Sequence, residues 1–231
     1  MKVKARAVKI YKPEIMLCPK CKSGLKYVYT VSNRIVQFSS GKIFRIKNMG
    51  YKCPLCNDNV FFSLTALKLA FKGYTYSAKV SCLIEYHKSK NETREKICDM
   101  LAESDIEISD RNVDMIYNKV KSYMDMDYDS KIHEAYDSMM KKFNEIRICL
   151  DLITIDTTVY IIMYNYFSGD IIALWKFDSI DNETIKELIR KYCDIKYNIT
   201  YILTIRPQFK FYGIIKENVP SRIKLISFSK F

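Results

Sequence analysis

Two Cys-x-x-Cys pairs constrain this chain more than any other feature of its sequence. They are Cys18-Pro19-Lys20-Cys21 and Cys53-Pro54-Leu55-Cys56, and 31 residues separate them. Each pair suits the tip of a tight turn, and four thiolates can together hold one tetrahedral Zn²⁺ ion. Four cysteine ligands leave no position for water, so the sequence predicts a closed, structural zinc site. Two disulfides or a redox-active pair are the alternatives, and the redox alternative lacks the βαβ context that it requires.

The residues between the two cysteine pairs predict a long β-hairpin. KYVYTVSNRIVQFSS and KIFRIKN are rich in β-branched and aromatic residues, and Ser39-Ser40-Gly41 supplies a turn between them. A hairpin joined to two such cysteine turns is the plan of a zinc ribbon. Residues 2–10 alternate basic and apolar side chains, which predicts either a strand with one basic face or an edge strand whose lysines deter aggregation.

The charge of the chain is concentrated at its N-terminal end. Residues 1–73, the predicted zinc-ribbon domain, hold 15 Lys and Arg against 2 Asp and Glu, whereas the whole chain of 231 residues has a net charge of +12. Such a basic segment is typical of a protein that binds a polyanion, most simply DNA, although a basic face can also serve solubility alone. The predicted DNA-contacting residues of this domain are Lys20, Lys22, Lys26, Arg34, Lys42, Arg45, Lys47 and Lys52.

The composition of the sequence limits the cellular compartments in which the chain is expected. No run of 18 apolar residues is present, so no transmembrane helix is expected, and the basic N-terminus lacks the apolar core of a secretion signal. The chain is therefore expected in the cytoplasm, where its eight cysteines stay reduced and serve as metal ligands or buried apolar side chains. Abundant Lys, Ile and Tyr with little Gln suggest a thermophilic source.

Residues 74–129 predict a helical domain with a helix-turn-helix. A short helix is first expected within Phe61–Lys72, with Ser63 as its cap. Three helices then follow, with Ser77, Asn91 and Ser109 as their N-caps. The helix from Asp110 would be the recognition helix, and its outward face would carry Arg111, Asn112, Asn118 and Lys119, residue types that suit contacts to DNA. The net charge of −4 argues against DNA binding here, so a bundle used for dimerisation or packing is the alternative.

Residues 130–231 predict a mixed sheet with helices. Three antiparallel strands are expected within Ile146–Asp178, as ICLDL, TVYIIMYNYF and IIALWKF, with ITIDT and Ser168-Gly169-Asp170 as turns. A helix at Asn182–Cys193, a strand at Ile199–Ile205, a helix at Phe209–Asn218 and a strand at Ile223–Phe228 follow. The order β-β-β-α-β-α-β is that of ribonuclease H-like domains. The whole chain is thus expected to be an α+β protein of several domains.

The chain resembles archaeal and bacterial DDE transposases that carry a zinc ribbon, a helix-turn-helix and a ribonuclease H-like domain. The pieces that carry the resemblance are CPKC, YKCPLC, the helical run GYTYSAKVSCLIEYHKSKNETREKICDMLAESDIEISDRNV, the strand ICLD, the turn NYFSGDII, and ITYILTIRPQFKFYGIIKENVPSRIKLISF. The family's chemistry needs three carboxylates around two divalent metal ions.

The resemblance places the first of these carboxylates at Asp151, with Asp156 as a less suitable second choice. The second should follow Ile202–Thr204, where this chain has Ile205 and Arg206 instead of an acid, and the third should lie beyond Phe231. A degenerate, C-terminally truncated relative is therefore expected, in which Asp151 is vestigial and pairs with Arg206. Asp151 can equally be an ordinary polar strand residue.

Three functions are consistent with these patterns. The first is a non-catalytic DNA-binding protein derived from a transposase, a regulatory or architectural factor associated with the nucleoid. The second is a protein-interaction module on the same folds. The third is a working metal-dependent transposase or nuclease with further ligands from Asp156, Asp170 or a partner subunit. DNA is the expected partner, a homodimer fits paired half-sites, and a protein partner fits the acidic helical domain.

Overall fold

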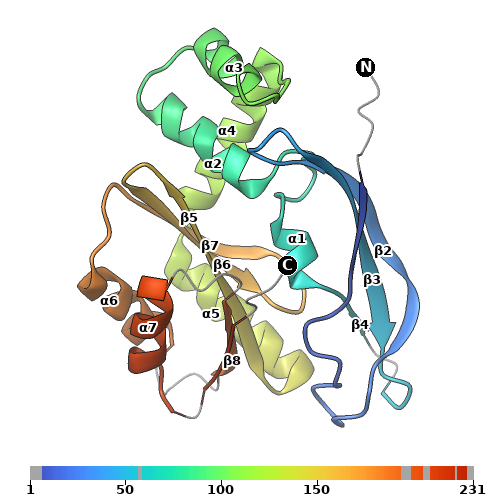
Figure 1. The fold of residues 1–231 in the computed structure, drawn as a ribbon. Helices are drawn as coiled ribbons and strands as arrows, with labels where there is room; N and C mark the ends of the chain where they lie inside the picture. The colour runs from blue at the N-terminus through green and yellow to red at the C-terminus, as the bar shows by residue number, and fades with distance from the viewer. Residues whose placement is uncertain (1–6, 57–58, 194–198, 205–208, 222, 228–231) are drawn as a thin grey trace. The chain divides into compact units, whose positions relative to one another are not determined.

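The computed structural model describes residues 7–56, 59–193, 199–204, 209–221 and 223–227. The chain divides into residues 1–122, here called unit 1, and residues 123–231, called unit 2. Both units combine helices with a sheet, so the α+β class expected from the sequence is confirmed (Figure 1). The predicted zinc-ribbon segment and most of the predicted helical domain belong to unit 1.

A four-stranded sheet organises unit 1. Its strands are β1 (Ala7–Tyr11), β2 (Lys26–Gln37), β3 (Ile43–Lys52) and β4 (Val60–Phe61). The central strand β3 pairs in parallel with β1, and antiparallel with β2 and β4. Strands β2 and β3 form the predicted hairpin, whose turn contains Gly41 at a φ of 69°.

Strand β2 carries two bulges. The register passes from Tyr27↔Tyr51 to Tyr29↔Gly50, and then from Thr30↔Met49 to Ser32↔Asn48. Val28 and Val31 are therefore extra residues that have no partner in the register, whereas β3 keeps a regular alternation. Bulges on an edge strand disturb its hydrogen-bonding ladder and discourage pairing with a further strand.

Helix α1 (Leu64–Lys68) packs on one face of this sheet. Ala66 of the helix lies in a core cluster with Val36 and Ile46, both of which are completely buried. Ser63 caps the helix as predicted, because its hydroxyl accepts a hydrogen bond from the Ala66 N–H. The helix is shorter than the sequence pattern suggested, since only residues 64–68 are helical.

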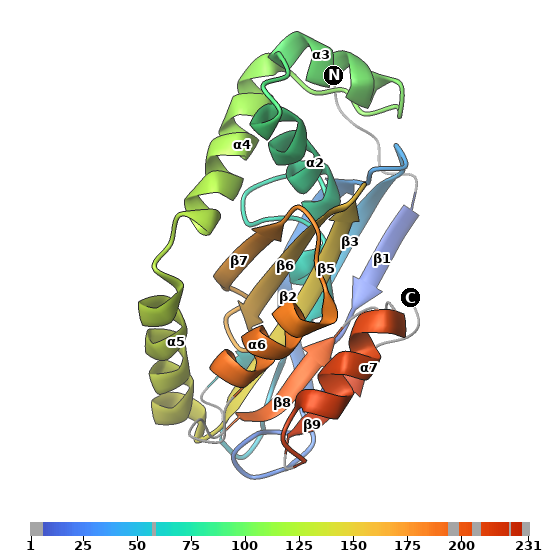
Figure 2. The ribbon, with the colours of Figure 1, turned by 90° about the vertical axis from the view of Figure 1, so that its left-hand side faces the viewer.

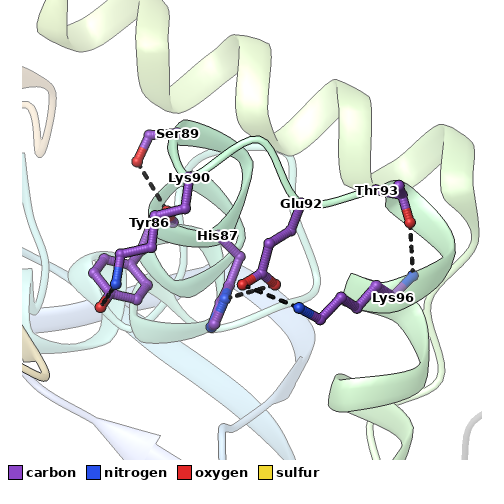
Figure 3. A network of polar contacts seen from close by, with 7 residues as sticks. All are labelled: Tyr86, His87, Ser89, Lys90, Glu92, Thr93 and Lys96. Atoms are coloured by element: carbon purple, nitrogen blue, oxygen red, sulfur yellow. Dashed lines mark hydrogen bonds and ion pairs between the residues drawn. The ribbon is translucent and has the colours of Figure 1, made fainter.

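Three longer helices complete unit 1, namely α2 (Ala78–Ser89), α3 (Arg94–Ala102) and α4 (Asp110–Met124). Ser77 caps α2 and Ser109 accepts from the backbone of the first turn of α4, as predicted. The prediction that Asn91 caps α3 is wrong, because Thr93 accepts from the Lys96 N–H instead (Figure 3). Asn91 lies in the left-handed region at a φ of 62°, just beyond the end of α2, so it takes part in ending one helix rather than starting the next.

Charged side chains hold the turn between α2 and α3. Figure 3 shows the Glu92 carboxylate between two cationic or ionisable groups, 3.0 Å from His87 Nδ1 and 3.5 Å from Lys96 Nζ. On the other side of the turn, the ammonium group of Lys90 contacts Tyr86, with Nζ 4.0 Å from the centre of its ring. The two Glu92 contacts join the end of α2 to the start of α3.

The tip of the hairpin is docked against the turn between α3 and α4. Gln37 Nε2 donates a hydrogen bond of 2.8 Å to the carbonyl oxygen of Asp105. A Cβ atom added to Gly41 would lie 2.6 Å from the Ser104 carbonyl oxygen and 2.7 Å from Asp105 Cβ. The hairpin and the turn between α3 and α4 are therefore packed against each other within unit 1, whereas the sequence predicted the sheet and these helices as separate domains.

We expect Gly41→Ala to destabilise unit 1 by about 2 kcal/mol, because the new methyl group both meets the Ser104 backbone and strains a left-handed residue. Gly73→Ala is the matched control, since Gly73 has a φ of 89° but nothing within 4 Å of an added Cβ. Urea unfolding followed by circular dichroism measures both variants. Equal losses of stability would show that backbone strain alone matters and that the docked tip contributes nothing.

Unit 2 contains the strands and helices predicted from the sequence. They are α5 (Tyr128–Phe143), β5 (Ile146–Ile155), β6 (Thr158–Asn165), β7 (Ile171–Phe177), α6 (Asn182–Tyr192), β8 (Ile199–Thr204), α7 (Phe209–Asn218) and β9 (Lys224–Ser227). The strand order is β7-β6-β5-β8-β9, antiparallel from β7 to β5 and parallel from β5 to β9. One predicted turn is too long, because β5 continues through Ile155 and only Asp156 and Thr157 turn the chain.

The core of unit 2 lies between one face of this sheet and its helices. Leu150 and Met163 of the sheet share a buried cluster with Tyr136 of α5, Ile189 of α6 and Ile215 of α7. The hydroxyl of Tyr136 donates to the carbonyl oxygen of Tyr192 at 2.9 Å, which satisfies a polar group inside this core. Helices α6 and α7 lie side by side on the sheet in both views (Figures 1 and 2).

Candidate metal centre and basic sheet face

The four predicted cysteine ligands converge at one end of the unit 1 sheet. Their sulfur atoms all lie within 4.8 Å of one another. Cys18 Sγ is 3.9 Å from Cys56 Sγ, and Cys21 Sγ is 3.4 Å from Cys53 Sγ. Within the described part of the chain, no other group of three or more His, Cys, Asp and Glu side chains lies close enough to share a metal ion.

The geometry of the cluster fits a tetrahedral metal ion. A Zn–S bond of about 2.3 Å places two tetrahedral ligands about 3.8 Å apart, close to the observed separations. A disulfide would need its sulfur atoms about 2.05 Å apart, and all eight cysteines are free, so the disulfide alternative is not realised in the structure. Four soft thiolates are a donor set that zinc accepts readily.

Backbone turns bring each cysteine pair to the cluster. In the first turn, the Cys18 N–H donates to the Ser23 carbonyl oxygen at 2.8 Å, and Leu17 and Gly24 form an antiparallel bridge at its base. In the second turn, which directly follows β3, the Cys56 N–H donates to Cys53 Sγ at 3.3 Å. A sulfur atom that accepts a backbone hydrogen bond is favoured as a thiolate, the form in which it binds metal.

Hydrogen bonds shift the pKa values of the Cys21 and Cys56 thiols in opposite directions. Hydrogen bonds from Ser23 lower the pKa of Cys21 to about 6, whereas hydrogen bonding with Cys21 raises the pKa of Cys56 to about 12. Without a metal ion, the raised pKa therefore favours the protonated form of the Cys56 thiol. A dipositive ion is needed to make all four thiolates compatible at such short separations.

The predicted DNA-contacting residues of the ribbon fall into two groups. Five lysine side chains are exposed or partly exposed around the turns of the sheet, namely Lys20, Lys22, Lys26, Lys42 and Lys52. Arg45 and Lys47 lie on the central strand β3. Arg34 has a structural role, because its guanidinium group donates to the carbonyl oxygens of Ala66 and Leu67 at 2.7 Å each, at the end of α1.

The alternation of β3 separates two different sheet faces. Ile46 and Asn48 point to the face that α1 covers, and both are completely buried. Arg45 and Lys47 point to the opposite face and are partly exposed. Residues that pair with Arg45 and Lys47 on the adjacent strands lie on the same face as these two cations.

We call this second face the basic sheet face. Val8 of β1 and Ile35 of β2 flank Arg45, and Ile10 and Asn33 flank Lys47. Further along the sheet, Met49 pairs with Thr30 and Tyr51 pairs with Tyr27. The residues of the face are thus Val8, Ile10, Tyr27, Thr30, Asn33, Ile35, Arg45, Lys47, Met49 and Tyr51.

Sequence reasoning did not single out the apolar members of the basic sheet face. The predicted basic side of residues 2–10 rests on Lys2, Lys4 and Arg6, which lie outside the described residues. Within β1, Lys9 points to the α1 side, where its ammonium group lies 4.3 Å from the centre of the Phe44 ring. The alternation of apolar and basic residues in β1 could have indicated that Val8 and Ile10 share one face of the sheet. Only the pairing of β1 with β3 shows which face this is.

The predicted recognition helix α4 presents its polar residues away from its core-facing residues Val113, Ile116 and Val120, which are buried. Arg111 and Asn118 are exposed, and Asn112 and Lys119 are partly exposed. One acidic residue on this helix is paired within the unit, because Asp114 accepts from Arg94 at 3.0 Å and lies 3.7 Å from Lys88. The net charge of −4 for residues 74–129 already counts Lys88 and Arg94, so this pairing leaves the net charge unchanged, but it occupies one of the two carboxylates of α4.

The candidate catalytic residue Asp151 lies in the middle of β5, is partly exposed, and pairs with Ile162 of β6. Strand β8 runs beside it in parallel and ends at Thr204, opposite Leu150. Arg206, the proposed ion-pair partner, lies outside the described residues. Asp156 and Asp170 occupy turns at opposite ends of β6, so these carboxylates do not converge on Asp151.

Comparison with known proteins does not assign the chain to a family. No protein-family model matches it, and no curated protein matches it. Among the helices that the structure describes, none combines the length and the apolar character needed to cross a bilayer. Any function has to rest on the geometry and charge set out above.

Proposed function

We propose that this protein is a non-catalytic DNA-binding protein, a regulatory or architectural factor in which a structural zinc ion organises a basic unit 1. The observation that carries the proposal is the concentration of cationic side chains on the sheet that ends in the four-cysteine cluster. Residues 1–73 contain 15 Lys and Arg but only 2 acidic residues. A fixed sheet that presents cations suits a phosphate backbone, because the charges need little rearrangement on binding.

The two acidic residues of this segment do not weaken the surface equally. Glu14 accepts hydrogen bonds from the backbone N–H groups of Leu64 and Thr65 and from the hydroxyl of Ser63. Its carboxylate is thus used at the start of α1, where the positive end of the helix favours an anion. Asp58 lies outside the described residues.

The helix-turn-helix segment supports the proposal as a second contact surface. Its outward residues Arg111 and Asn118 are exposed, and its turn is docked on the hairpin tip. A recognition helix acts best when a rigid support fixes its angle to the groove. The packing of sheet and helices in unit 1 supplies such a support.

Unit 2 supports a non-catalytic scaffold of ribonuclease H-like type. From β5 to β9 its elements follow the order β-β-β-α-β-α-β, the order along the chain on which the comparison with ribonuclease H-like domains rests. A two-metal site requires several carboxylates close together. Among the described residues, Asp151 belongs to no group of three or more acidic, His or Cys side chains that could hold a metal ion, and unit 2 is proposed to have kept the fold without the chemistry.

We expect binding to a 20-base-pair duplex to weaken steeply with salt. About six phosphate contacts would lower the affinity about a thousandfold between 50 and 200 mM salt, because each contact releases bound counterions. Fluorescence anisotropy with a labelled duplex measures this slope. Lys20→Ala combined with Lys26→Ala should reduce it by about 2, whereas Lys131→Ala combined with Lys141→Ala on exposed positions of α5 should leave it unchanged. No binding at 50 mM salt would refute the proposed function.

A cleavage assay tests the alternative of a working nuclease. We expect no strand cleavage with Mg²⁺ or Mn²⁺, and no change in DNA binding for Asp151→Asn, because one carboxylate cannot hold two metal ions. Gel electrophoresis of supercoiled, linear and branched DNA measures cleavage. Metal-dependent cleavage that Asp151→Asn abolishes would replace the scaffold proposal with a catalytic one.

A further inference from the structure

The basic sheet face combines cations with exposed apolar side chains, which plain phosphate binding does not require. Ile10 is 61% exposed, Val8 is 54% exposed and Tyr27 is 52% exposed. Because β3 alternates regularly, Arg45 and Lys47 stand in the same face, next to Val8 and Ile10. A partner that matches this face must offer both negative charge and exposed apolar surface.

We propose that the basic sheet face binds single-stranded nucleic acid, an inference that rests on the proposed DNA-binding function and specifies the form of its ligand. A single strand presents phosphates and unstacked bases together, whereas a duplex hides the faces of its bases in the stack. The central cations would contact the phosphates. The flanking apolar side chains and the ring of Tyr27 would contact the bases.

The position of Tyr27 gives the face a fixed aromatic edge. Its ring meets Tyr51 edge to face, with their centres 5.9 Å apart. Tyr51 is itself buried, so it supports the exposed ring from the side. A base that stacks on a preorganised ring loses little side-chain entropy from the protein, and such stacking contributes substantially to single-strand binding whatever the base.

The β2 edge of this sheet is poorly suited to an added β-strand, because the bulges at Val28 and Val31 interrupt its ladder. Charge complementarity also selects the partner, because Arg45 and Lys47 lie in the middle of the face rather than at its rim. An anionic strand laid across the sheet places its charges over both residues.

The zinc cluster explains how the face keeps its shape. Strand β3 leads directly from Tyr51 and Lys52 into Cys53, and the other cysteine turn precedes β2 by only a few residues. The metal therefore clamps the ends of the two strands that carry Tyr27 and Tyr51. Loss of the ion would be expected to disorder the aromatic edge first.

Fluorescence anisotropy with a labelled 20-nucleotide oligothymidine tests the inference on the full-length, zinc-loaded protein. Tyr27→Ala should weaken binding about tenfold, as expected for the loss of one stacked base. Arg45→Ala combined with Lys47→Ala should reduce the slope of log affinity against log salt by about 1.4, because each contact to a single strand contributes about 0.7. Unchanged zinc stoichiometry would show that the cysteine end of unit 1 is folded in each variant, and unchanged emission of Trp175 would show that unit 2 is folded.

Lys9→Ala is the matched control, because it removes the same charge from the same sheet but from the face that α1 covers. It should leave single-strand binding within about twofold of the unaltered protein. If Lys9→Ala reduces the salt slope by about 0.7, half of the reduction expected for the Arg45 and Lys47 pair, binding depends on total charge and the inference is wrong.

Other outcomes separate this inference from the proposed function. If the protein binds duplex DNA but the Tyr27, Arg45 and Lys47 variants bind single strands as well as the unaltered protein does, the inference is wrong and the proposed function stands. Absence of binding to both forms would overturn both proposals. If Ile10→Asp splits a dimer in sedimentation without changing oligothymidine binding, the face joins two copies of the chain instead.

Discussion

Removal of the metal ion should unfold the cysteine end of unit 1 while leaving unit 2 folded. Structural zinc contributes about 10–16 kcal/mol to the folding of small zinc domains, because the unfolded chain has no preformed site. Here the four thiolates approach within 4.8 Å, and without a cation they would repel one another or take up protons. We expect a strong chelator to remove the ordered β2–β3 hairpin end and to abolish DNA binding.

The two units can be followed separately in this experiment. The chain has a single tryptophan, Trp175, which lies in unit 2 with its ring 5.3 Å from that of Tyr128 and 5.4 Å from that of Tyr192. Its emission should not change when the chelator is added. Cobalt substitution supplies the second signal, since thiolate-to-cobalt charge transfer absorbs in the near ultraviolet only while the site is formed.

Single cysteine variants provide the controls. Cys18→Ser should lower the metal content below one ion per chain and remove most of the cobalt absorption, because the sulfur atom is a direct ligand. Cys98→Ser should retain one ion, since Cys98 lies on α3 and contacts Asp110 rather than the cluster. A protein that binds no zinc when purified under reducing conditions, and whose melting is insensitive to chelators, would contradict the proposed structural metal.

The parts of the structure that local patterns determine could be predicted from the sequence. The spacing of Cys18, Cys21, Cys53 and Cys56 identified a cluster that the structure brings together. The β-β-β-α-β-α-β order of unit 2 also followed from short apolar runs and turn residues, because each run is bounded by residues that cannot continue it. In such cases one stretch of chain contains all the information that its conformation needs.

Features that depend on pairing between distant residues could not be predicted. The faces to which Tyr29 and Thr30 point depend on the bulge at Val31, because one extra residue reverses the alternation, and the second bulge at Val28 restores it for Tyr27. The parallel pairing of β1 with β3 decides that Ile10 lies beside Lys47. The role of Arg34 likewise depends on α1 ending beside it, so a residue counted as a phosphate contact from composition turned out to bind backbone carbonyls.

Helix caps show the same limit on a smaller scale. Asn91 and Thr93 are both good N-cap residues, and only the left-handed conformation of Asn91 decides between them. The docking of Gly41 on Ser104 leaves no local trace except a glycine in a turn, where glycine is common anyway. Tertiary contacts thus account for most of what was missed in unit 1.

Asn48→Leu should destabilise unit 1 by about 4 kcal/mol, although it replaces a polar residue with an apolar one in a buried position. Asn48 is completely buried, and its side chain bonds Ser63 twice: Nδ2 donates to the carbonyl oxygen and Oδ1 accepts from the N–H, both at 2.8 Å. Leucine would leave both backbone groups without partners, at about 1–3 kcal/mol each. It would also disturb the Ser63 cap, and with it the docking of α1.

Asn33→Leu is the control for this prediction, because Asn33 is exposed on the basic sheet face and its amide oxygen has only a 3.4 Å contact with Arg45. Its stability should stay within about 0.5 kcal/mol of the unaltered protein, as for most surface substitutions. Urea unfolding followed by circular dichroism measures both variants. A loss below about 1 kcal/mol for Asn48→Leu would mean that Ser63 finds other partners. The opposite result, a large loss with zinc content unchanged, would show that two separate features hold the sheet, the metal at its end and the Asn48 hydrogen bonds beneath its centre.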